Sequence, residues 1–139
     1  MGVTFSTMPS FDNFGAADVL DAAEKFVGKM DEGELGAQLA QSERAMPPPV
    51  REALVESIFD AFRQRGESSE DVAEGAGTTV DTIASNGNGG MDALLKYART
   101  NAGVLREATT IFIENHPAYL QHLSPVLTEG IAKRLEVSG

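Results

Sequence analysis

The chain has 139 residues, of which 42% are apolar and 23% are charged, and its formal net charge is −10. These values are typical of one globular domain, and the lack of cysteine excludes disulfides, thiolate chemistry and cysteine-based zinc sites. No apolar stretch reaches the roughly 18 residues that a membrane span needs, so we expect a soluble protein of the cytoplasm with no membrane partner.

Apolar residues at helical spacing recur along most of the chain. Residues 1–15 are rich in turn formers and predict an irregular N-terminal arm, whereas residues 16–139 predict a single helical domain. The first two helices are expected over residues 16 to about 32, ended by a glycine, and over residues 34–45. The three prolines at 47–49 then break the pattern, and the last of them is expected to open the next helix.

The middle of the chain predicts one long helix and two short ones. Residues 50–65 carry the clearest apolar stripe. Ser68 and Thr78 each precede an aspartate by three residues, a spacing that predicts helix caps. The Asn- and Gly-rich residues 86–90 predict a loop and a possible boundary between two lobes.

The remainder of the chain predicts a second group of helices. These are expected over residues 91–99 and 103–115, with a short turn opened by Pro117 and a last helix begun by the cap-plus-proline pair at 124–125. No segment alternates with period two. The sequence therefore predicts an all-α fold, a small irregular or orthogonal bundle of about seven or eight short helices.

Residues 68–85 have the spacing of a helix-turn-helix. Ala73 lets two helices approach, and Gly77 suits a left-handed turn. The β-branched Val80 and Ile83 would anchor the second helix. This segment resembles the helix-turn-helix motif of bacterial and archaeal regulators, over about 20 of the 139 residues. The resemblance implies a DNA-binding transcriptional regulator with the candidate residues Ala73, Gly77, Thr79, Val80, Thr82 and Ile83.

The distribution of charge favours a different function. Residues 67–90 contain five acids and no Lys or Arg, although a recognition helix needs cations that neutralise phosphates. Residues 1–85 carry 16 acids and 6 bases, a net charge of −10, whereas residues 86–139 carry five of each. An acidic field favours basic protein partners, unless it serves solubility alone. The leading hypothesis is protein–protein interaction, as an adaptor, assembly component or regulator, with a basic partner or in a homo-oligomer; a helix-turn-helix regulator using residues 68–85 is the alternative.

Catalytic patterns are sparse, and we expect no enzyme. The nearest approach to a metal or acid–base cluster is Glu114, His116, Tyr119 and His122, which lacks the two-ligand helical spacing of zinc sites. A helix-boundary role for His116, directly before a proline, explains that residue equally well. We assign no catalytic residue, no cofactor and no metal site from the sequence.

Overall fold

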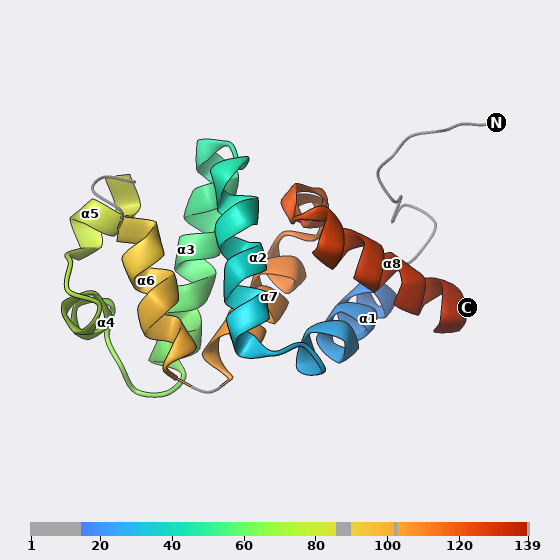
Figure 1. Ribbon diagram of the computed structural model, residues 1–139, viewed down its shortest axis with the longest axis horizontal. Helices are drawn as coiled ribbons and strands as arrows, with labels where there is room; N and C mark the ends of the chain where they lie inside the picture. Colours follow the sequence, from blue (N-terminus) through green and yellow to red (C-terminus); the bar gives the residue numbers. More distant parts are fainter. Residues whose placement is uncertain (1–14, 86–89, 102, 139) are drawn as a thin grey trace.

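The computed structural model describes residues 15–85, 90–101 and 103–138 (Figure 1). These ranges contain eight α-helices, one 3₁₀ helix (η1) and no strand, so the predicted all-α bundle is confirmed. The helices are α1 (Ala16–Gly28), α2 (Glu32–Arg44), α3 (Pro48–Arg63), α4 (Ser69–Gly75), α5 (Val80–Ser85), α6 (Gly90–Arg99), α7 (Val104–Asn115), η1 (Pro117–His122) and α8 (Pro125–Ser138). The predicted arm and the predicted lobe boundary lie outside the described residues, apart from Gly15 and Gly90.

Helices α3 and α7 form the centre of the bundle and pack against each other (Figure 1). Helices α1 and α8 cover one end, where α1 also packs against α7, and helices α4, α5 and α6 form the other end. The core is one continuous apolar cluster, in which Phe62 of α3 and Phe112 of α7 are the largest fully buried side chains. No helix in the described part of the chain is both long enough and apolar enough to cross a membrane.

The predicted boundary between the first two helices is wrong. Helix α1 ends at Gly28 rather than near residue 32. Asp31 is the N-cap of α2, since its carboxylate accepts hydrogen bonds from the backbone N–H groups of Gly33 (2.9 Å) and Glu34 (3.3 Å). These bonds satisfy donors that have no partner within the helix. The glycine expected to end the first helix therefore lies in the first turn of the second.

One predicted helix start also differs from the structure. Pro48, not Pro49, is the first residue of α3, and Pro47 is its N-cap. The last helix begins at the predicted Pro125, and the hydroxyl of the preceding Ser124 donates to Oε1 of Gln38 (2.7 Å), which joins the start of α8 to α2. This bond uses the hydroxyl proton, whereas a cap uses the hydroxyl oxygen as an acceptor, so the cap role of Ser124 stays a prediction.

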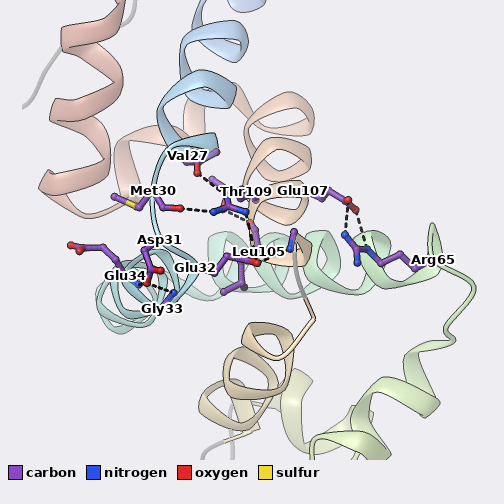
Figure 2. A network of polar contacts seen from close by, with 12 residues as sticks. Val27, Met30, Asp31, Glu32, Gly33, Glu34, Arg65, Leu105, Glu107 and Thr109 are labelled. Atoms are coloured by element: carbon purple, nitrogen blue, oxygen red, sulfur yellow. Dashed lines mark hydrogen bonds and ion pairs between the residues drawn. The ribbon is translucent and has the colours of Figure 1, made fainter.

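The first turn of α7 collects polar contacts from the junction of α1 and α2 (Figure 2). Arg106 donates to the carbonyl oxygens of Val27 (3.1 Å) and Met30 (2.7 Å), at the C-terminal end of α1. Glu32, the first residue of α2, accepts from the N–H of Gly103 (2.7 Å), the N-cap of α7. A cation at the end of one helix and a carboxylate at the start of another both suit the helix dipoles. This network fixes how α1, α2 and α7 meet.

Candidate functional site

Helices α4 and α5 form a tight corner at one end of the bundle, next to α6 (Figure 1). Gly77 has φ +81°, a left-handed conformation that glycine adopts without strain. Its N–H donates to the carbonyl of Glu74 (3.0 Å), and the N–H of Thr78 donates to that of Ala73 (2.9 Å). This pair of bonds is a Schellman motif, which ends α4 and turns the chain into α5.

Thr79 caps α5, so the predicted cap, Thr78, is wrong by one residue. The hydroxyl oxygen of Thr79 accepts from the N–H of Thr82 (3.1 Å), and the same hydroxyl donates to the hydroxyl oxygen of Thr82 (2.8 Å). In contrast, Ser68 caps α4 as predicted, with a bond from the N–H of Asp71 (3.2 Å). The two threonines expected on a DNA-reading surface thus hydrogen-bond to each other.

The six residues of the helix-turn-helix pattern occupy different environments. Ala73 and Ile83 are buried in the core, at 2% and 0% exposure. Val80, the first residue of α5, and Thr82 are half-buried, and Gly77 and Thr79 are exposed. DNA binding by this corner stays a prediction.

An open hollow of about 660 Å³ lies in this corner. It is lined by Glu70, Asp71, Ala73, Glu74, Gly77, Thr78, Thr79, Val80 and Asp81. Of these lining residues, four are acidic and none is basic, and all four acidic residues are exposed. Half-buried Val80 adds apolar surface. The hollow combines an anionic rim with apolar lining, which attracts cations and can cover apolar groups.

The corner is attached to the bundle by Arg51 of α3, a role that was not predicted from the sequence. Its guanidinium donates to the carbonyl oxygens of Ile83 (2.7 Å) and Ala84 (3.4 Å), in the last turn of α5. It also forms an ion pair with Glu43 of α2 (3.1 Å), and both side chains are almost fully buried. One guanidinium therefore joins α2, α3 and α5.

Tyr97 of α6 forms a second attachment, to α4. Its ring stacks on Phe62 at 5.4 Å between centroids, and its hydroxyl donates to Oε1 of Glu67 (3.2 Å). The ring lies so close to Gly75 that a Cβ there would approach within 2.7 Å of it. Burial first, and then the hydrogen bond to Glu67, raises the pKa of Tyr97 above its usual value.

The histidines form an aromatic cluster at the other end of α7. His116 stacks on Tyr119 at 4.8 Å between ring centroids, and His122 meets the same ring edge-on at 6.1 Å. Exposed Glu114 lies near the end of α7. Across residues 15–85, 90–101 and 103–138, no group of three or more His, Asp or Glu side chains is placed to hold a metal ion.

Comparisons with other proteins do not indicate a function. The chain matches no model of a known protein family, no curated protein and no solved structure. Support for a function therefore comes from the geometry and charge of the corner.

Proposed function

We propose that this protein is not an enzyme and binds a basic segment of a partner protein at the α4–α5 corner, as an adaptor, assembly component or regulator in the cytoplasm. The hollow between the two helices, with four carboxylates and no basic residue in its lining, carries this proposal. A Lys or Arg side chain that enters it meets opposite charge at its head. The apolar lining covers the methylene stem of the same side chain.

The charge of the whole chain favours a different protein as the partner over a second copy. The sequence has 21 acids and 11 bases, and residues 86–139 carry no surplus of positive charge. Four arginines form ion pairs with acids of their own chain, namely Arg51, Arg63, Arg65 and Arg106. A second copy carries the same net charge of −10 and is repelled by the corner, whereas a basic partner neutralises it.

The helix-turn-helix resemblance supports the alternative, a DNA-binding regulator. The same four carboxylates oppose it, because they lie beside Thr79 where a phosphate backbone would approach. Thr79 and Thr82 also hydrogen-bond to each other and so are less available to bases. A basic peptide remains the better occupant of this corner.

The proposal can be tested with a fluorescein-labelled amphipathic peptide of Lys, Leu and Ala, about 15 residues long. The variant E70Q/E74Q/D81N removes three charges from the hollow. Because each exposed ion pair contributes about 0.2–1 kcal/mol, we expect its affinity for the peptide to fall about tenfold. Added salt should weaken binding to the wild-type protein as well.

A matched control separates the hollow from general acidity. The variant E24Q/E52Q/E129Q removes the same number of charges from exposed residues of α1, α3 and α8. It should bind the peptide as the wild-type protein does, and a peptide with Glu in place of Lys should bind none of the three proteins. An equal loss of affinity in both variants would refute a site at the corner.

A further inference from the structure

Helix α5 is a short element that Arg51 joins to α3, in addition to its packing contacts with α4 and α6. It has six residues, and Ile83 is its one buried side chain. Helices this short are unstable alone and depend on tertiary contacts. The carbonyl groups in the last turn of a helix lack partners within it, and two of those in α5 accept from the buried guanidinium of Arg51. A cation at this position also suits the negative end of the helix dipole.

We propose that Arg51 is a latch that holds α5 against the bundle, and that α5 opens as a local unit when the latch is released. Local opening is the expected behaviour of a segment that contributes few buried contacts. Helix α3, in contrast, has ten buried residues and packs on α7 in the centre of the molecule. Release of α5 leaves that central packing in place.

The latch would also control the proposed binding site, and this step rests on the proposed function. Val80 and Asp81 line the hollow from α5, whereas Glu70 and Glu74 line it from α4. When α5 moves away, these two walls separate and the hollow is lost. A partner that contacts both walls binds the latched form, so it shifts the population toward that form.

Hydrogen exchange measured by mass spectrometry tests the latch without any partner. In R51M, the amides of α5 should exchange about ten- to a hundredfold faster than in the wild-type protein, because hydrogen bonds from a charged donor are lost. The amides of α3 and α7 should keep their rates. The control R63M removes an exposed arginine of the same helix, which pairs with Glu56 and Asp60, and should leave the exchange of α5 unchanged.

Two further variants keep the test decisive if R51M does not fold. The double variant R51M/E43Q avoids an unpaired buried carboxylate, which is strongly destabilising, and should expose α5 in the same way. E43Q alone retains the bonds of Arg51 to α5 and should keep most of its protection. Unchanged exchange of α5 in both R51M and the double variant, or equal acceleration of α3, α5 and α7 in every variant that lacks Arg51, would overturn the latch.

Peptide binding then separates the latch from the proposed function. If the wild-type protein binds the labelled basic peptide, R51M/E43Q should bind it at least about tenfold more weakly, in line with the loss of α5 protection. Equal affinity, despite an exposed α5, would overturn the control of the site by the latch. If the wild-type protein does not bind the peptide, the proposed function fails, while the exchange experiment still decides whether Arg51 holds α5.

Discussion

The ring of Phe26 in α1 occupies the space that a side chain at position 130, in α8, would need. A Cβ built on Gly130 would overlap with carbon atoms of that ring. The two helices that cover this end of the bundle therefore approach each other at a residue without a side chain (Figure 1). Glycine is required here for close packing.

Gly130→Ala should accordingly destabilise the protein by about 1–3 kcal/mol, since the added methyl group forces Phe26 or α8 to shift. Gly28→Ala is the matched control, because a Cβ there meets nothing within 4 Å. Gly28 is the last residue of α1, and alanine should be neutral or slightly stabilising at that position. Urea unfolding followed by circular dichroism measures both variants. Equal stability of the two would show that the helices do not meet as described.

Arg106 should contribute more to stability than the exposed Arg63. Arg106→Met removes two hydrogen bonds to carbonyl groups at the end of α1, and we expect a loss of about 1–2 kcal/mol. Arg63→Met removes only exposed ion pairs and should change the free energy of unfolding by less than about 0.5 kcal/mol. Chemical unfolding of the two variants under the same conditions gives the comparison, and a larger effect of Arg63→Met would contradict it.

Tyr97 should make stability depend on alkaline pH. The pKa of a tyrosine in an unfolded chain is about 10, and burial raises the pKa of Tyr97 in the folded protein above its usual value. Well below this pKa both states hold the phenolic proton, so the contribution of Tyr97 is present in full. As the pH rises through the folded pKa, this contribution is lost, because the unfolded state releases the proton first.

Tyr97→Phe removes this pH-dependent contribution. Urea midpoints of the wild-type protein and the variant, measured from about pH 8 to about pH 11, should converge at the alkaline end as the wild-type protein loses stability faster. The second tyrosine, Tyr119, is common to both proteins and cancels in the difference. A difference that stays constant over this range would show that the phenol titrates alike in both states.

The cap of α5 gives a local prediction. Thr79→Ala removes the hydroxyl that accepts from the N–H of Thr82, a loss of about 1 kcal/mol, so the amides of α5 should exchange roughly fivefold faster. Thr78→Ala removes the residue that spacing alone predicts as the cap and should have a smaller effect. The reverse order of the two variants in hydrogen exchange would favour the prediction from spacing.

The sequence was sufficient to predict the class of fold because helical periodicity is strong and local. The stripe over residues 50–65 corresponds to α3, and Ser68 caps α4 as its spacing predicts. Boundaries were less predictable where several residues were able to act as caps. Asp31 is followed by Glu32 and Gly33, and Thr78 is followed by Thr79, so local spacing did not decide between the candidates.

The candidate site depends on contacts that local patterns do not specify. The carboxylates of residues 67–90 were visible in the sequence, but their arrangement around a hollow requires the turn at Gly77 and the placement of α4 beside α5. The sequence carries one indication that Arg51 is buried, because Arg51 lies seven residues before Ile58, on the same buried face of α3. A cation on an apolar stripe predicts a buried partner, although spacing does not show that this partner is the end of α5.

The central claim is that the α4–α5 corner receives a basic protein segment and not a nucleic acid. The most direct measurement is fluorescence anisotropy of two labelled probes, the basic amphipathic peptide and a random-sequence DNA duplex, each titrated with the wild-type protein at about 50 mM salt, where weak phosphate contacts are strongest. We predict saturable binding of the peptide, weakened in E70Q/E74Q/D81N, and no binding of the duplex. Saturable, salt-sensitive binding of the duplex without binding of the peptide would contradict the account and favour the helix-turn-helix regulator.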